Sequence, residues 1–313
     1  MDAISEPWPE LTYSSWRDTA ATLQLWTQIA GKIRLQLTPW VNHSWHVPLY
    51  VTSRGLGTSP IPAGNEILEL EFDFVGQRLL ARTSAGGEAA LPLVPQAVAD
   101  FYDAVLHLLR GLGIAVAING MPNEIPDAIR FAQDRIHRSY DADAAHRFWR
   151  ALIRIERIFA LFRSGFLGKV SPVHFFWGSF DLAVTRFSGR TAPPHPGGVP
   201  GLPDAVVREA YSHEVSSAGF WPGNDRFPRP AFYSYAYPAP AGFRDRPVTA
   251  GAYFDEALGE FILPYDTLRG AADPDALLLD FLSTTYAAAA DAAGWDRAAL
   301  EGPLGVPARV RPI

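Results

Sequence analysis

The chain contains one series of landmarks twice, in the same order, and this feature constrains its fold most. Each series has a Trp-Arg pair, an apolar stretch ending in Gly-Lys, a Val-Thr pair, a Glu-x-x-Leu-Pro motif and a helix-like segment. The first copy has them at Trp16-Arg17, Gly31-Lys32, Val51-Thr52, Glu88 to Pro92 and residues 101–113. The second has them at Trp149-Arg150, Gly168-Lys169, Val184-Thr185, Glu260 to Pro264 and residues 281–294. Five landmarks in one order indicate an internal duplication.

Hydrophobic periodicity predicts similar elements in both copies. In the first, it predicts a helix ending at Gly31, strands at residues 33–37, 47–51, 67–74 and 78–83 with a third hairpin strand, and a helix following Pro95. In the second, it predicts a helix at 144–166, a strand at 173–187, a helix ending near 212–214, strands at 232–237 and 260–265, and a helix at 277–293. The turns between strands are short, which favours antiparallel pairing. We therefore expect an α+β fold of two pseudo-symmetric helix–antiparallel strands–helix repeats packed into one unit.

The expected boundaries follow from the landmarks and from proline-rich stretches. The first repeat covers residues 1–118, a connector covers 119–143 and the second repeat covers 144–302. A proline-rich tail at 303–313 is expected to be either disordered or wrapped on the surface.

Composition excludes several classes of function. A net charge of -6 and a charged fraction of 19% give no basic footprint for nucleic acid. Cysteine is absent, so any metal would be bound by histidine, carboxylate or backbone oxygen. The acidic start, Met1 to Glu6, lacks the features of a signal peptide, and no apolar stretch reaches the roughly 18–20 residues of a membrane span. We expect a soluble cytoplasmic protein that binds neither nucleic acid nor membrane; its oligomeric state is not readable from the sequence.

Four long strings carry a resemblance to a known family. They are residues 25–35, 42–51, 171–182 and 211–223, which are rich in tryptophan, histidine, glycine and serine. These strings resemble a bacterial family catalogued as domain of unknown function 5996. The similarity covers the chain from about Trp8 to Glu301. This family has no assigned activity, so the resemblance implies no cofactor and no catalytic residue.

Histidines within these strings are the first candidate site. His46, His174 and His213 lie at expected strand or helix edges, with His43 near the first and Glu214 beside the last. Imidazole binds divalent transition metals and also moves protons near neutral pH. Three interpretations remain open: a metal held by His46, His174 and His213; acid–base chemistry without metal; or histidines that only hydrogen-bond within the core.

Polar and aromatic groups of the second repeat form the second candidate. On a strand running from His174, Asp181 would share a face with Ser179 and Thr185, and a buried carboxylate there needs a partner. Arg186 or Arg190 either supplies that partner or binds an anionic substrate in a bidentate fork. The row Tyr233, Tyr235 and Tyr237 either lines a pocket or covers half-buried sheet surface.

These features predict one pocket, lined mainly by the second repeat and closed by His43 and His46. We expect an enzyme that acts on a small polar or anionic molecule, either through a bound metal or through acid–base chemistry. The expected catalytic residues are His174, His213, Glu214 and Asp181, and the expected substrate-binding residues are Arg186, Arg190, Trp45, Trp177, Trp221 and Tyr235. The alternative is a non-catalytic small-molecule-binding module, in which the aromatic cluster supplies affinity and the histidines are structural.

Overall fold

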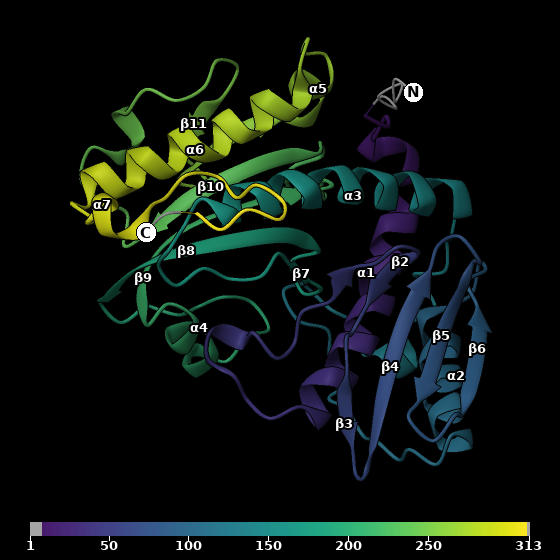
Figure 1. The fold of residues 1–313 in the computed structure, drawn as a ribbon. Coiled ribbons are helices and arrows are strands. Elements are labelled where there is room, and N and C mark those ends of the chain that lie inside the picture. Colours follow the sequence, from purple (N-terminus) through teal and green to yellow (C-terminus); the bar gives the residue numbers. More distant parts are fainter. Residues whose placement is uncertain (1–7, 312–313) are drawn as a thin grey trace.

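The computed structural model describes residues 8–311, which form two antiparallel sheets flanked by helices (Figure 1). The first sheet contains β1 (Tyr50–Val51), β2 (Gly55–Gly57), β3 (Ile61–Ala63), β4 (Glu66–Asp73), β5 (Arg78–Thr83) and β6 (Glu88–Pro92). Its order is β1-β2-β4-β5-β6, and β3 pairs with the start of β4 on the same edge as β2. The predicted α+β class and the predicted hairpin strands of this half are confirmed.

The second sheet follows later in the chain and carries the cavity described below. Its strands are β7 (His174–Phe176), β8 (Asp181–Thr191), β9 (His213–Trp221), β10 (Ala231–Tyr237), β11 (Tyr253–Asp255) and β12 (Glu260–Pro264). They lie in the order β11-β12-β10-β9-β8-β7. The two sheets meet at one point, where the backbones of Leu49 and Phe175 exchange hydrogen bonds of 2.9 Å.

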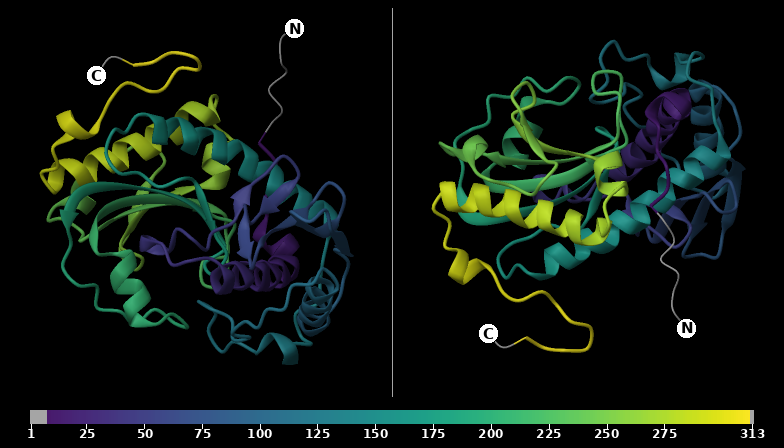
Figure 2. Two further views of the ribbon diagram at one scale, coloured as in Figure 1. Left: turned by 60° about the horizontal axis from the view of Figure 1, so that its bottom comes forward. Right: turned by 90° about the horizontal axis from the view of Figure 1, so that it is seen from above.

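Helices connect and cover these sheets. The α-helices are α1 (Tyr13–Leu37), α2 (Val98–Gly111), α3 (Ala142–Ser164), α4 (Asp204–Ala210), α5 (Tyr265–Arg269), α6 (Pro274–Ala292) and α7 (Arg297–Leu300). Single 3-10 turns are η1 (Asn42–Ser44), η2 (Phe131–Gln133) and η3 (Phe243–Asp245). Figures 1 and 2 show α3 and α6 side by side on one face of the second sheet, with α4 beyond the opposite face.

Helix α3 ties the two halves into one core. It contacts β1 and β2 of the first sheet, β8 of the second, and the helices α1 and α6. Asp141 caps its start by accepting a 3.0 Å hydrogen bond from the backbone of Ala144. The helix buries Phe148, Leu152 and Ile155 completely, within a single apolar cluster that includes both sheets. The wide apolar arc of this segment therefore correctly predicted a central helix.

Alternation along the strands gives the second sheet two different faces. Leu182, Val184, Phe220 and Phe232 join the main apolar core on the face covered by α3 and α6. The residues between them face the other way, where a smaller apolar cluster includes Tyr233. That second face is available to form a binding site.

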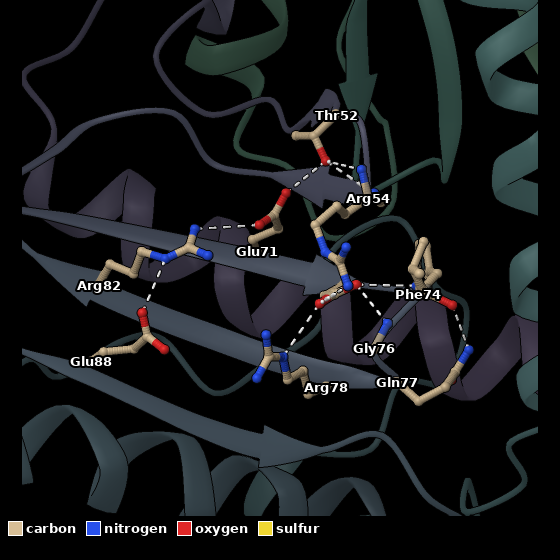
Figure 3. Close-up of polar contacts among 12 residues, drawn as sticks. Thr52, Arg54, Glu71, Phe74, Gly76, Gln77, Arg78, Arg82 and Glu88 are labelled. Atoms are coloured by element: carbon tan, nitrogen blue, oxygen red, sulfur yellow. Dashed lines mark hydrogen bonds and ion pairs between the residues drawn. The ribbon is translucent and has the colours of Figure 1, made fainter.

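A buried carboxylate fixes the turn between β4 and β5 in the first sheet (Figure 3). Asp73 is fully buried, and its carboxylate pairs with Arg54 at 2.9 Å and Arg78 at 3.3 Å. It also accepts hydrogen bonds from the backbone of Val75 and Gly76. The side chain thereby satisfies the backbone donors of a tight turn.

Three predictions about elements were wrong. Helix α1 continues through Gly31 to Leu37, so residues 33–37 are helical and not a strand. Gly31 allows close packing: a Cβ there would lie 2.1 Å from Nε1 of Trp177. The predicted strand 173–187 is a hairpin that turns at Trp177 to Phe180, between β7 and β8. Residues 213–221 are strand β9, which the prediction of a helix and a loop missed.

The pseudo-symmetric repeat is not confirmed. Strand β12, which carries the second Glu-x-x-Leu-Pro motif, pairs with both β10 and β11, whereas β6 pairs only with β5 among the described strands. Lys32 lies inside α1, whereas Lys169 lies beyond the end of α3. Thr52 follows β1, whereas Thr185 is in the middle of β8. The recurring landmarks therefore occur in different local structures in the two halves of the chain. The predicted domain boundaries at 118 and 143 remain predictions.

The last described residues of the chain lie on the surface. Within residues 8–311, no helix combines the length and apolar character needed to cross a membrane. Residues 303–311 run past the end of α3, where the backbone of Gly305 donates a 2.8 Å hydrogen bond to Ser164, so this part of the tail is wrapped on the surface. Met1 to Glu6, on which the prediction of no signal peptide depends, lie outside the described residues. The cytoplasmic location remains a prediction.

Candidate functional site

A cavity of about 340 Å³ opens on the second face of the second sheet. Its floor is built from alternate residues of β8, β9 and β10, and its walls come from residues 43–47, Glu124 and the segment 199–211 that includes α4. Alternate strand residues share a face, so the polar side chains Asp181, Thr185 and Ser217 project into the same space. This volume is at the lower end of the range of small-molecule sites.

A glycine in the floor allows a tyrosine to cross the sheet. Gly219 on β9 lies between Ala183 on β8 and Tyr233 on β10. A Cβ at Gly219 would lie 2.3 Å from the ring of Tyr233, so only glycine leaves room for this ring to lie over β9. The Tyr233 hydroxyl reaches β8 and donates a hydrogen bond to Oδ2 of Asp181, while Ser179 donates to Oδ1. Asp181 is thus positioned by two hydroxyl donors.

Three carboxyl groups line this cavity among the described residues: Glu124, Asp181 and Glu260. Burial raises the pKa of Asp181 to about 6, against the opposing effect of the Ser179 and Tyr233 hydrogen bonds. Burial, and then the charge of Asp181, raises the pKa of Glu124 to about 7. Burial, and then the charges of Asp181 and Asp255, raises the pKa of Glu260 to about 8. Near neutral pH the three groups therefore differ in protonation, which suits acid–base chemistry.

The connector between the halves supplies Glu124, which the sequence analysis did not identify as a site residue. Its backbone has φ 60°, in the left-handed region, and its neighbour Asn123 exchanges hydrogen bonds of 2.8 and 2.9 Å with the buried side chain of Gln28 on α1. Lys32 donates to the side chain of Asn123. A Cβ at Gly178 would lie 2.0 Å from Oε1 of Glu124, so the carboxyl group packs against bare backbone. These contacts hold Glu124 at the cavity wall.

His174 lines the cavity as a neutral imidazole. It is 1% exposed, and neither ring nitrogen has a hydrogen-bond partner in residues 8–311. Burial, and then the charges of Arg34 and Arg163, lowers its pKa to about 3. A neutral imidazole offers one donor and one acceptor, and in His174 neither is used within the described residues.

His43 also lines the cavity, but its ring nitrogens are occupied. Nε2 accepts a 2.6 Å hydrogen bond from the Lys169 ammonium group, so Nδ1 carries the proton and donates to the Ala210 carbonyl at 2.8 Å. The His43 backbone donates to the Glu209 carboxylate at 3.0 Å. Burial lowers the pKa of His43. His43 therefore joins η1 to α4 and holds the wall closed.

The proposed metal ligands are not brought together. His46 packs against Trp40 and accepts a 3.2 Å hydrogen bond from the backbone of Val41. His213 lies outside the cavity lining, next to the ring of His43. Across residues 8–311, no group of three or more histidines and acids is placed to hold a metal ion. The three sequence strings share a composition, but they place His46, His174 and His213 in separate environments.

Three other predicted site residues, Glu214, Arg186 and Arg190, do not line the cavity that residues 8–311 form. Glu214 follows His213 on β9 and so faces the opposite side, where it pairs with Arg190 at 2.7 Å. The Arg186 guanidinium lies 3.5 Å from the ring centroid of Phe162 and donates to the Phe162 carbonyl. Neither predicted role of these arginines, partner of Asp181 or anion fork in this cavity, agrees with their position.

The predicted aromatic residues do lie in the cavity lining: Trp45, Trp177, Trp221 and Tyr235. Trp221 stacks on Tyr233 with ring centroids 4.5 Å apart. The Tyr235 hydroxyl lies 2.8 Å from that of Tyr211, a residue that sequence reasoning missed. The indole N–H of Trp177 donates to the Val47 carbonyl at 2.9 Å, which fixes the ring in the notch at Gly31. These rings make the walls rigid and largely apolar.

No curated protein and no solved structure matches this chain. The match that was found is to a family, and it extends through both sheets and the connector. The sequence pattern of the family of unknown function DUF5996 matches residues 8–302, and the chain therefore belongs to this family.

Proposed function

We propose that this protein is an enzyme that binds a small polar molecule in the cavity and catalyses a proton-transfer step on it. The observation that carries the proposal is the convergence of Glu124, Asp181 and Glu260 in one aromatic-walled cavity. Their pKa values of about 7, 6 and 8 lie near neutrality, where a general base and a general acid are most effective.

The carboxyl groups divide the roles by their pKa values. Asp181 has the lowest pKa of the three and is the general base, with Tyr233 and Ser179 holding its orientation. Glu124 and Glu260 stay protonated to higher pH and serve as general acids. His174 contributes a neutral donor and acceptor that orient the bound molecule. This assignment replaces His213 and Glu214 of the sequence analysis with Glu124 and Glu260.

A second candidate is the non-catalytic binding module, and the aromatic lining favours it. Trp45, Trp177 and Trp221 line a cavity that is small enough to enclose a ligand. In that case the carboxyl groups supply hydrogen bonds and no bond in the ligand changes. Turnover of a bound molecule separates the two candidates.

The test is to incubate the purified protein with a defined mixture of small polar metabolites and to follow their concentrations by NMR. We expect at least one compound to be converted by the wild type, and Asp181→Asn to slow its conversion by about 100-fold or more, since a general base contributes about that much. The rate should rise through about pH 6 and fall above about pH 7, following Asp181 and then Glu124, the general acid that loses its proton first. Glu69→Gln, an exposed change on β4, is the matched control.

Two outcomes contradict the enzyme proposal. One is conversion by Asp181→Asn at the wild-type rate. The other is a compound that binds in the cavity, with its NMR lines shifted or broadened by the wild type, but remains unchanged after prolonged incubation. The second outcome favours the binding module.

A further inference from the structure

We propose that the molecule bound in this cavity is a protonated amine, an organic cation that carries at least one N–H donor. This inference rests on the proposed function, because it concerns the same cavity and names the class of molecule that the site takes. Three observations support the inference: the charges that face the cavity, the aromatic rings of its walls, and polar atoms that have no hydrogen-bond partner in the described chain.

The first observation is an imbalance of charge. Glu124, Asp181 and Glu260 face the cavity, and the part of its lining that residues 8–311 supply contains no lysine or arginine. The bases there are His43 and His174. Burial lowers the pKa of both and keeps both rings neutral, and the contact with Lys169 acts in the same direction on His43. A positive ligand would supply the missing countercharge, because ionised carboxylates in a buried site require a partner.

The cation of Lys169 does not fill this role. Its ammonium group lies 2.6 Å from Nε2 of His43 and sits over the rings of Trp45 and Phe187, at 5.1 and 4.8 Å from their centroids. Asp181 is the first residue of β8, and Phe187 lies further along the same strand. Burial lowers the pKa of Lys169. The arginines at the predicted site, Arg186 and Arg190, belong to the opposite face.

The second observation is a pair of unpartnered polar groups. Oε2 of Glu260 is buried and has no hydrogen-bond partner in the described chain. Both nitrogens of His174, which is 1% exposed, are also unpartnered there. Buried polar atoms without partners are rare, and those in a cavity lining are groups that a bound molecule can pair with. An ammonium N–H would give the Glu260 carboxyl group a partner, whereas His174, on β7 at the far edge of the sheet from β12, would pair with a different part of the bound molecule.

The third observation is the row of rings on the floor. Trp221 stacks on Tyr233, and Tyr233 is nearly parallel to Tyr235, at an interplanar angle of 16°. Aromatic faces attract cations placed over them. The Tyr233 hydroxyl is already donated to Asp181, and the Tyr235 hydroxyl bonds to that of Tyr211, so these tyrosines add aromatic surface to the floor and no free hydroxyl donor. Such a floor does not favour an anionic ligand.

The test compares amines with matched alcohols, in which a hydroxyl replaces the ammonium group. The probes are n-butylamine and 1-butanol, benzylamine and benzyl alcohol, and tyramine and tyrosol, titrated into the full-length protein by calorimetry. At least one amine should bind at least about tenfold more tightly than its alcohol. Glu260→Gln should weaken that amine about tenfold or more without changing the alcohol, whereas Glu69→Gln should change neither.

Proton release gives a readout that does not depend on a variant. A cation paired with Glu260 favours the ionised form of that group and leaves Glu124 as the general acid, so amine binding should release protons between about pH 7 and pH 8, as measured in buffers of different ionisation enthalpy. Amine affinity should increase from about pH 6 to about pH 8, because the probes stay protonated while Glu260 ionises. The tyrosines of the cavity titrate far above this range, since burial raises their pKa values.

The inference is overturned if no amine binds better than its alcohol, whether or not an alcohol binds. It is also overturned if n-butyltrimethylammonium, a quaternary cation with neither an N–H nor an O–H donor, binds more tightly than all three amines, because Glu260 then has no donor to accept from. Either result leaves the acid–base proposal to be decided by the metabolite conversion experiment, in which a neutral substrate would still depend on Asp181.

Discussion

At the scale of single residues, the two sheets differ in the direction in which the pKa values of their buried carboxyl groups are shifted. Burial raises the pKa of Glu260 in the second sheet, whereas Asp73 in the first sheet has a lowered pKa. For Asp73, burial acts to raise the pKa, but the Gly76 backbone and the two arginines outweigh it. The first sheet thus uses its carboxylate for structure, and the second sheet retains carboxyl groups that lack such compensation.

Glu260→Gln should stabilise the protein at alkaline pH. The pKa of Glu260 is raised from 4.5 to about 8, so the folded state binds a proton that the unfolded chain loses, and the stability contributed by this group falls as pH rises across that window. We expect the variant to be more stable than the wild type by about 4 kcal/mol at pH 8 and equally stable near pH 4.5. Urea unfolding at both pH values measures this, and an equal difference at both would contradict it.

Asp73→Asn should destabilise the first sheet. The change removes two ion pairs and weakens acceptors for two backbone N–H groups in a fully buried turn, and we expect a loss of about 1–3 kcal/mol. Because the pKa of Asp73 is lowered, its contribution should disappear as pH falls through the folded-state pKa. Glu88→Gln, in an exposed pair with Arg82, is the control and should change stability by less than about 1 kcal/mol. Equal effects in urea unfolding would show that the Asp73 network is not stabilising.

At the scale of elements, close packing at glycine decides where helices and rings can lie. Gly31 allows α1 to pass directly against Trp177, and Gly219 allows Tyr233 to cross β9. In both places the ring then contributes to the cavity. The glycines therefore shape the site although neither has a side chain.

Gly31→Ala should destabilise the protein even though alanine is the better helix former by about 1 kcal/mol. The new Cβ would lie 2.1 Å from Trp177, whose ring must shift and weaken its bond to Val47. We expect a net loss of about 1–3 kcal/mol in thermal or urea unfolding. Gly111→Ala is the matched control, because its Cβ would meet nothing within 4 Å, and it should be neutral or slightly stabilising. If Gly31→Ala were as stable as the wild type, the Trp177 ring would be able to shift without loss of stability, which contradicts this prediction.

Elements governed by local pattern were predictable, and those governed by distant contacts were not. The periodicity of α3 and the alternation of β4 and β5 lie within single segments, so the sequence predicted them. Gly31 looked like a helix end because its packing partner, Trp177, is remote in the sequence. The hairpin at 177–180 was missed because both its strands are apolar and its turn is rich in aromatic residues.

The residues of the candidate site divide in the same way, into those that local sequence predicted and those that it did not. His174, Asp181 and the tryptophans stood out as polar or large aromatic groups in apolar strings, and the structure places them in one cavity. Glu124 gave no such signal, because its position depends on Gln28 of α1, which bonds to the backbone of the preceding residue, Asn123. Arg186 was assigned a partner from chain proximity, but the alternation of β8 turns it toward α3.

At the scale of the whole molecule, the two sheets share one apolar core through α3. We expect the full chain to unfold in one cooperative transition, and a fragment of residues 144–302 to lack fixed tertiary structure, because it loses α1 and the Leu49 backbone that pairs with Phe175. Near-ultraviolet circular dichroism and NMR spectra of the fragment test this. A dispersed spectrum and a cooperative melt would show instead that the second half is an independent domain.

The position of α3 also has a consequence for biosynthesis. The ribosome releases every strand of the first sheet before it releases α3, yet that helix is what covers β1 and β2 and what donates the Trp149 indole hydrogen bond to Thr52. A nascent chain that ends in the connector therefore exposes an unfinished apolar surface around Leu56, which is fully buried in the complete protein. Surfaces of this kind are prone to aggregate and are what chaperones bind. The partly synthesised chain is therefore more prone to aggregate than the completed fold.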